Sequence, residues 1–360
     1  MRTGRRKWVY IIIAAAVVFA IISVSWLISM QFNSSHLTVA VKTNKTTSPE
    51  NSILYVSGHV NPYIPFLGCS QNNCSRPTGL VSYGIYNVGN AKSYKVKTTG
   101  LLGSATIYSI KSHNPGNSIV PSNTATLQLN GVLVVQNKNG STNEYFMQLV
   151  TLFYTNSNVI SFFSSITGAN NESNTEKGYF YGSRNCAFLA NAPQYYVCTF
   201  PLNGSERIPV QKPLSIAEGL YTTTKNGSVW VFPDVAFSGN GSIDYNLFSS
   251  NFSIIDKNAT SSYFLVDGMN YATSNTAFFD AEFVFGGPNV YERAATFTSM
   301  NSVLNLMYYN SSTNRFQNFS SYYNFGYDTT EAASALSTSL LHNGSITVTV
   351  GKPDYGYIGG

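Results

Sequence analysis

Two short stretches carry paired carboxylates in a chain that holds only 16 Asp and Glu among 360 residues. The first is FFDAEFVFGGP, residues 278–288. On a β-strand, Asp280 and Glu282 would share one face, with Cα atoms about 7 Å apart, while Ala281 and Phe283 would share the other. Aromatic neighbours supply an apolar setting that raises the pKa of one member of a carboxyl pair, as acid–base chemistry requires. The alternative is structural: an exposed strand face, or an acid that caps a turn.

The second stretch is YNFGYDTTEAAS, residues 323–334. Asp328 as N-cap and Glu331 at the third helical position form a capping-box arrangement, which predicts a short helix over about 329–341. The helical spacing is carried by Ala332, Ala335, Leu336 and Leu340, with Gly344 beyond the end. Capping alone explains both acids. The start of a capped helix can still point into a cleft, so capping does not exclude a catalytic role for Asp328 and Glu331.

Other catalytic patterns are absent from the sequence. It contains no G-x-S-x-G elbow, no P-loop and no dinucleotide-binding fingerprint. The histidines are far apart, and no HxxH or HExxH pattern indicates a metal site; they are His36, His59, His113 and His342. The carboxylates are therefore the main candidates for chemistry.

The elements that would position these acids are short apolar or alternating runs, broken by Gly, Asn and Pro. Alternation, β-branched and aromatic residues and the turn pair Asn139-Gly140 predict antiparallel strands. The clearest runs are residues 80–88, 104–110, 125–135, 145–154, 228–233 and 263–268. We therefore predict an all-β, sandwich-like fold of two fused lobes, with a possible lobe break in the polar run 168–178 and one C-terminal helix.

The N-terminus predicts a membrane anchor. A basic cluster is followed by an uncharged apolar run over residues 8–30, long enough to cross a hydrocarbon core of about 30 Å. The cations precede the span, which places the N-terminus in the cytoplasm and the remainder outside the cell. The alternative is a cleaved signal peptide, although no small-x-small cleavage site stands out. The predicted organisation is a cytoplasmic tail (1–7), a transmembrane helix (8–30), a polar stalk (31–50), a β-rich ectodomain (51–350) and a C-terminal tail (351–360).

Charge and cysteines narrow the class of protein further. Without the four cations of the tail, 17 Lys and Arg face 16 Asp and Glu, so the charge gives no support for nucleic-acid binding. Four cysteines outside the cytoplasm favour two disulfides. Of the three possible connectivities, local pairing of Cys69 with Cys74 and of Cys186 with Cys198 is the simplest. Many N-x-S/T sequons, several in Asn-Gly-Ser turns, predict surface glycosylation.

An ordered set of motifs resembles the thermopsin family of archaeal acid proteases. The matching stretches are ILYVSGHVNPYIPFLG (53–68), PTGLVSYGIYNV (77–88), TTGLLGSATIYSI (98–110), ATLQLNGVLVV (125–135), DAEFVFGGP (280–288), VLNLMYYN (303–310) and NFGYDTTEAA (324–333). The resemblance spans roughly residues 53–345. It implies a secreted or surface endopeptidase that acts on polypeptides in acid, with no metal or organic cofactor.

An acid protease needs one ionised carboxylate to activate water and one protonated carboxyl to polarise the peptide carbonyl. The acids that coincide with family motifs predict Glu282 and Glu331 as the working pair, supported by Asp280 and Asp328. Two departures favour another class of protein. Leu149 stands where thermopsins often have Asp or Asn, and Ser164 and Ser165 stand where they often have an Asp-Asn pair. The second hypothesis is therefore a catalytically degenerate, glycosylated surface protein with a binding or structural role.

Overall fold

The computed structural model describes much of the chain after residue 77. The described residues are 78–82, 85–87, 92–93, 95–114, 121–168, 180–182, 185–190, 192–200, 207–238, 246–249, 252–255, 258–266, 281–288, 295–319, 323–325, 333–341 and 343–351. Residues Ser52–Gly360 form one compact unit. Across the described part of the chain, no helix has the length and apolar character that crossing a membrane demands. The predicted span at residues 8–30 and most of the predicted lobe break lie outside the described residues.

All described elements are β-strands. In chain order they are β1 (Thr78–Ser82), β2 (Ile85–Asn87), β3 (Lys92–Ser93), β4 (Val96–Thr98), β5 (Gly100–His113), β6 (Thr124–Asn137), β7 (Thr142–Tyr154), β8 (Val159–Gly168), β9 (Phe180–Gly182), β10 (Cys186–Leu189), β11 (Ala192–Phe200) and β12 (Ile208–Pro209). They continue with β13 (Leu214–Lys225), β14 (Ser228–Ser238), β15 (Asn246–Ser249), β16 (Phe252–Ile255), β17 (Ala259–Val266), β18 (Ala281–Gly286), β19 (Ala295–Asn310), β20 (Arg315–Asn318), β21 (Tyr323–Phe325), β22 (Ala333–Ser334), β23 (Leu336–Leu340) and β24 (Ile346–Val350). The prediction of an all-β protein is confirmed.

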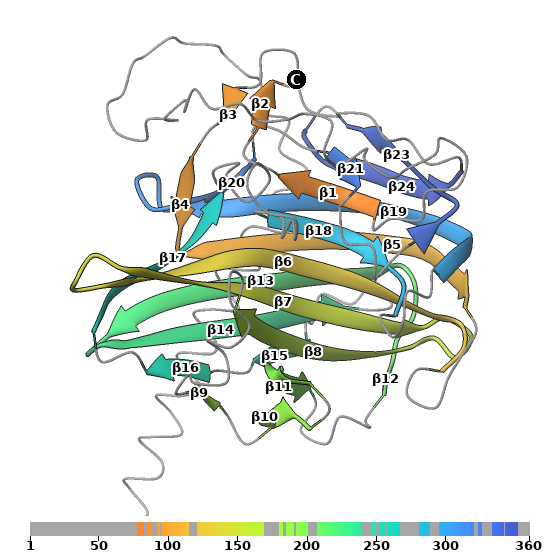
Figure 1. Cartoon of the computed structure of the whole chain (residues 1–360). Coiled ribbons are helices and arrows are strands. Elements are labelled where there is room, and N and C mark those ends of the chain that lie inside the picture. The colour runs from red at the N-terminus through yellow and green to blue at the C-terminus, as the bar shows by residue number, and fades with distance from the viewer. Residues whose placement is uncertain are drawn as a thin grey trace, which may run out of the picture. The chain divides into compact units, whose positions relative to one another are not determined.

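The described strands form two large sheets and one small one (Figure 1). The first sheet has the order β10-β11-β8-β7-β6-β18-β1-β21, with β12 beside β8 and with β17 joining β6 to β4. The second has the order β23-β24-β19-β5-β13-β14-β16-β9, with β15 beside β14 and with β20 and β22 beside β19. Strands β2 and β3 pair separately. Pairing is antiparallel as predicted, except for the short parallel pair of β19 with β22.

The hairpin of β6 and β7 forms the centre of the first sheet. Its strands pair without a register shift from Thr124↔Tyr154 to Gln136↔Thr142. The turn contains Gly140 at φ +81°, a conformation that glycine adopts without steric cost. The predicted Asn139-Gly140 turn is therefore present, and it fixes which side chains of β6 and β7 share a face.

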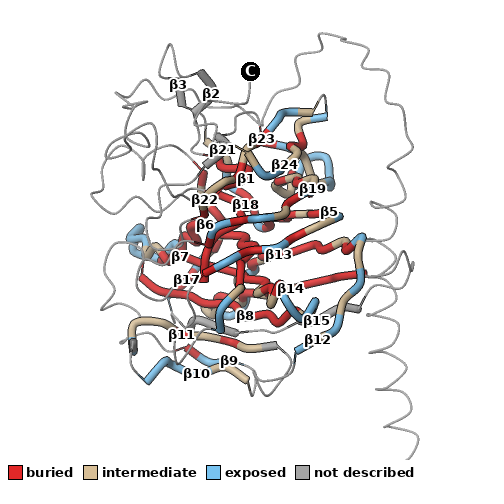
Figure 2. The backbone as a smooth tube through the Cα atoms, turned by 90° about the vertical axis from the view of Figure 1, so that its right-hand side faces the viewer, coloured by how far each residue is buried: buried red, intermediate tan, exposed pale blue. Residues whose placement is uncertain are grey.

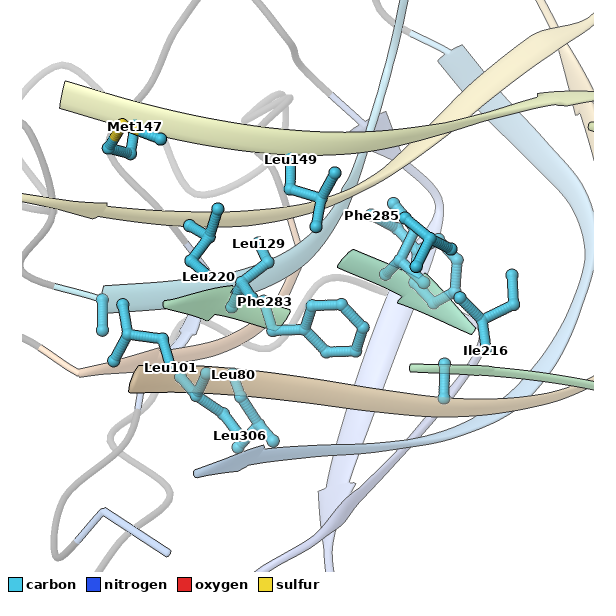
Figure 3. Packing of buried hydrophobic residues seen from close by; sticks show 14 of the residues in the cluster. Leu80, Leu101, Leu129, Met147, Leu149, Ile216, Leu220, Phe283, Phe285 and Leu306 are labelled. Atoms are coloured by element: carbon cyan, nitrogen blue, oxygen red, sulfur yellow. The ribbon is translucent and has the colours of Figure 1, made fainter. Parts of the chain in front are cut away.

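The two large sheets pack against each other through a continuous hydrophobic core. Aromatic pairs cross between them: the Phe162 and Phe237 ring centroids are 5.6 Å apart, and those of Phe285 and Phe297 are 6.3 Å apart. Gly103 on β5 lies so close to the Phe283 ring that a Cβ there would come within 2.4 Å of it. Figure 2 shows the buried residues concentrated along the central strands, and Figure 3 shows aliphatic and aromatic side chains meeting between the sheets. We call the face of each sheet that lines this core its inner face.

The predicted C-terminal helix is wrong where the structure describes it. Residues 333–334 and 336–340 form β22 and β23 instead. Strand β23 pairs with β24 from Leu336↔Val350 to Leu340↔Ile346, and Ala335 between the two strands has φ +62°, which interrupts any helix. The run Ser337-Thr338-Ser339 has poor helix propensity and gains a full ladder of hydrogen bonds beside β24, which outweighs the spacing of the apolar residues.

Candidate active site

Strand β18 places Glu282 in the middle of the first sheet. The strand lies between β6 and β1, and Glu282 pairs with Asn130 on one side and Val81 on the other. Ala281 and Phe283 belong to the hydrophobic core, so Glu282 faces the opposite, outer face of the sheet, as the alternation of strand side chains predicts. Glu282 is only 1 % exposed. The structural alternative of an exposed strand face is therefore wrong.

Glu282 belongs to a row of buried polar side chains on this outer face. We call the row the polar strip; its members are Thr126, Gln128, Asn130, Gln148, Ser165 and Glu282. They come from four neighbouring strands, β18, β6, β7 and β8, and are brought together by the register of these strands. Each member alternates along its strand with residues of the inner face, because side chains point to opposite faces in turn.

Hydrogen bonds connect the polar strip. The Asn130 amide Nδ2 donates to Glu282 Oε1 at 2.5 Å and to Gln128 Oε1 at 3.2 Å. Gln148 Nε2 also donates to Gln128 Oε1, at 3.4 Å, and the Ser165 hydroxyl donates to Gln148 Oε1 at 3.1 Å.

The strip is neutral apart from its one carboxyl group. An N–H donor from Asn130 stabilises the carboxylate form of Glu282. Buried amides and hydroxyls around it form a fixed set of dipoles, which is the kind of preorganised setting that enzymes use where charge develops. The arrangement suits a carboxylate that accepts a proton from a bound molecule.

The structure contains a second, fully buried glutamate, Glu218 on β13. It points from the inner face of the second sheet toward the first, where the Thr151 hydroxyl donates to its Oε1 at 2.5 Å. Burial raises the pKa of Glu218 well above its ordinary value of 4.5; hydrogen bonds from the Thr151 side chain and from the backbone of Leu129 and Thr151 lower it without offsetting the burial. Glu218 is therefore a carboxylic acid that stays protonated over a wide range of pH.

The other predicted catalytic residues have no described placement. Asp280, Asp328 and Glu331 lie outside the described residues, so their distances from Glu282 stay predictions. Among the predicted disulfides, Cys186 and Cys198 are bonded and face each other across β10 and β11, which confirms that pair. Cys69 and Cys74 lie outside the described residues. The described part of the chain contains no group of three His, Cys, Asp or Glu that could hold a metal ion.

The two departures from the family pattern meet at one point of the first sheet. Leu149 on β7 pairs directly with Ser164 on β8. Leu149 belongs to the hydrophobic core, and the buried Ser164 hydroxyl has no hydrogen-bond partner among the described residues. Ser165, by contrast, pairs with Gln148 and belongs to the polar strip. Leu149 and Ser164 thus lie on the face opposite Glu282.

Sequence reasoning missed most of the polar strip and all of Glu218. In ATLQLNGVLVV, the polar residues at 126, 128 and 130 alternate with apolar ones, a pattern typical of a strand with a solvated face. The available signal was that these residues are neutral amides and hydroxyls, without the charges that usually mark a solvated face. Glu218 sits in LSIAEGLY with no second acid nearby, so nothing in its surroundings along the chain set it apart.

Comparisons with known proteins place the chain in a family. A search of curated proteins finds no match. The family profile described as thermopsin matches residues 60–336, which cover most of the chain and include both glutamates and the whole polar strip. By this match, the chain belongs to the thermopsin family.

Proposed function

We propose that this protein is an acid endopeptidase in which Glu282 is the carboxylate that activates water. Family membership supports peptide-bond hydrolysis and polypeptide substrates. The observation that carries the role of Glu282 is its position: a buried carboxyl group, hydrogen-bonded by Asn130, within a strip of neutral polar side chains. In this proposal Glu331 supplies the protonated carboxyl that polarises the peptide carbonyl, and Asp280 and Asp328 support the pair.

The chemistry follows from what each carboxyl group can do in acid. The Glu282 carboxylate takes a proton from water, the water oxygen bonds to the carbonyl carbon, and the carbonyl oxygen takes the proton of the second carboxyl. When the C–N bond breaks, Glu282 returns its proton to the leaving nitrogen, and the second carboxyl takes its proton back from a hydroxyl of the tetrahedral intermediate, so both groups return to their starting forms. One ionised and one protonated carboxyl coexist at about pH 2–4, where two neighbouring carboxyls share a proton.

The test is digestion of a denatured protein at about pH 2–4 by the purified chain and its variants. Glu282→Gln and Glu331→Gln should each lower turnover by about 10²- to 10⁴-fold, because an amide can neither ionise nor exchange the proton. The double variant should be hardly worse than either single variant, since residues that act as a unit are not additive.

Glu218→Gln is the matched control for this experiment. It replaces the other fully buried glutamate, and at acid pH glutamine resembles the protonated acid that Glu218 already is. It should leave turnover near the wild-type value. An active wild type with unchanged Glu282→Gln and Glu331→Gln variants would remove both residues from the mechanism.

A second candidate function is a catalytically degenerate surface protein with a binding or structural role. The pairing of Leu149 with Ser164 favours it. Both positions differ from the polar residues that thermopsins often have there, and the two differences meet at one cross-strand pair. A wild-type chain that is inert from about pH 2 to 6, after removal of any pro-segment, would favour this function over hydrolysis.

The proposal places the β-rich domain outside the cell, anchored through residues 8–30. The four cations before that apolar run support this orientation, and the Cys186–Cys198 disulfide is consistent with an oxidising compartment. Protease added to intact cells should therefore digest the domain once it is denatured. A domain that resists external protease even when denatured would contradict this topology.

A further inference from the structure

The polar strip contains a buried hydrogen-bond acceptor that the strip itself leaves unused. Asn130 is 1 % exposed, and its Oδ1 has no donor among the described residues. Its Nδ2, on the same amide group, donates to Glu282 Oε1 and to Gln128 Oε1. A buried carbonyl oxygen without a donor is costly, and what distinguishes this one from others in the chain is that its amide contacts the Glu282 carboxyl group, where a bound molecule can supply the donor.

The orientation of the Asn130 amide is fixed by a chain of hydrogen bonds that begins at a backbone carbonyl. The Thr126 hydroxyl donates to Gly287 O, so its oxygen accepts from Gln128 Nε2 at 3.0 Å. Gln128 must therefore turn its Oε1 toward Asn130. Gln128 Oε1 and Glu282 Oε1 are both acceptors, so Asn130 must turn its N–H groups toward them. In the flipped orientation, Asn130 Oδ1 would instead face these two acceptor oxygens and no hydrogen bond could form.

The unused acceptor consequently lies beside the carboxyl group of Glu282. Nδ2 and Oδ1 belong to one planar amide, so Asn130 Oδ1 and the Glu282 carboxylate lie on neighbouring groups that one small molecule can bridge. Water fits this pair of acceptors, since it has two O–H donors and keeps its lone pairs for attack. A carboxylate alone holds a water through one donor and leaves its rotation free.

We propose that Asn130 Oδ1 accepts a hydrogen bond from the water that Glu282 deprotonates, and so orients that water toward the peptide carbonyl. This inference rests on the proposed function. One O–H bond of the water breaks toward Glu282 and its oxygen bonds to the carbonyl carbon, while the other O–H group donates to Asn130 throughout. Asn130 is thereby a catalytic residue of the same site, and it forms no covalent bond.

The experiment uses the full chain with substitutions of Asn130 and measures kcat, KM and the pH profile on one peptide substrate. Asn130→Ala should lower kcat by at least about 10-fold with KM little changed, because the loss affects water and leaves peptide binding intact. In Asn130→Asp, the protonated acid donates to Glu282 and keeps a carbonyl acceptor. Its activity should therefore survive at acid pH and disappear as the introduced carboxyl group ionises, above the ordinary aspartate pKa of about 3.9, because burial and the neighbouring Glu282 carboxylate both raise the pKa of the new group.

Asn130→His separates the acceptor role from the donor role. At acid pH, imidazolium donates N–H groups to Glu282 and has no acceptor. A folded Asn130→His variant should be inactive where Asn130→Asp is active. Asn137, the last residue of the same strand, provides the matched control. It is also buried, its Oδ1 also has no donor among the described residues, and its Nδ2 donates to Ser141 Oγ in the turn that follows β6. Asn137→Ala and Asn137→Asp should keep the wild-type pH profile.

The outcomes separate this inference from the proposed function. An inert wild-type chain overturns both. An active wild type whose Glu282→Gln variant is inactive, but whose Asn130→Ala variant keeps kcat within about twofold, overturns the role of Asn130 alone. The same holds if folded Asn130→His is as active as Asn130→Asp, because the N–H donor would then suffice. If the His variant does not fold, the Ala variant and the pH profile of Asn130→Asp decide the question.

Discussion

Glu282 and Glu218 are both almost completely buried, yet their surroundings differ in kind. Glu282 lies on the outer face of the first sheet, where Asn130 donates to its carboxyl group and begins a chain of hydrogen-bonded amides and hydroxyls that extends across β6, β7 and β8. Glu218 points into the core between the sheets, with one hydroxyl donor from Thr151. Burial alone thus does not identify a catalytic acid. The neighbours decide whether a buried carboxyl group can exchange a proton or only keep one.

The core around Glu218 explains its raised pKa. Ile216 and Leu220 flank it on the same face of β13, and Leu129 and Leu149 line the facing sheet; Figure 3 shows these side chains as part of the hydrophobic core. On β14, Asp234 pairs with Gly219, the residue next to Glu218, and therefore lies on the outer face of the second sheet. No charged side chain of the described strands around Glu218 shares its inner face, so nothing there offsets the loss of hydration on ionisation.

The largest expected difference between the two glutamates is in how Glu218 makes the free energy of unfolding depend on pH. The raised pKa of Glu218 means that the folded chain keeps a proton that the unfolded chain releases above about pH 4.5. The unfolded state then binds fewer protons than the folded state, so this group's contribution is complete below that pH and is lost as pH rises toward the folded pKa. Glu218→Gln removes this loss. Between about pH 4.5 and the folded pKa of Glu218, the free energy of unfolding of Glu218→Gln, relative to that of the wild type, should rise by about 1.4 kcal/mol per pH unit.

Urea unfolding of wild type and Glu218→Gln at pH 3, 5 and 7 measures this difference. At pH 3 the two should be similar, because glutamine replaces a protonated acid of nearly the same shape. A constant difference between the two proteins at all three pH values would contradict a protonated Glu218. It would also remove the contrast with Glu282, since both glutamates would then tolerate burial as carboxylates.

The sequence predicts where strands occur better than it predicts which strands pair and in which register. Alternation and turn residues identify β5, β6, β7 and β14, because both signals are local. The helix over 329–341 fails because its spacing is also local, whereas the competing ladder with β24 is not. Register between distant strands has no comparable signal along the chain, and register alone brings Asn130 beside Glu282.

The candidate site is predicted in the same uneven way. Glu282 is identified because a family motif surrounds it, and the face it occupies follows from alternation. Its burial does not follow, since a D-x-E on a strand is equally compatible with a solvated face. No feature of the sequence identifies Glu218 as a buried acid. Its hydrogen-bond partner Thr151 is 67 residues away in the chain, and the sequence does not indicate which face of β13 is buried.

The smallest predicted effect concerns the hydroxyl group that holds Glu218. Thr151→Val keeps the shape of the side chain and removes the donor to Glu218 Oε1, which should cost about 1–2 kcal/mol of stability at pH 3. The hydroxyl lowers the pKa of Glu218, so it stabilises the ionised form more than the neutral one. The cost of Thr151→Val should therefore stay constant while Glu218 keeps its proton and grow only as pH rises through the folded pKa of Glu218. It should lose this pH dependence in a Glu218→Gln background, which a double-mutant cycle by urea unfolding measures. Proteolysis at about pH 3 should be unchanged, because Thr151 lies on the face opposite the polar strip. A cost that is equal at every pH and in both backgrounds would show that Thr151 does not act through the Glu218 carboxyl. The difference between the two buried glutamates would then rest on their apolar and polar surroundings alone.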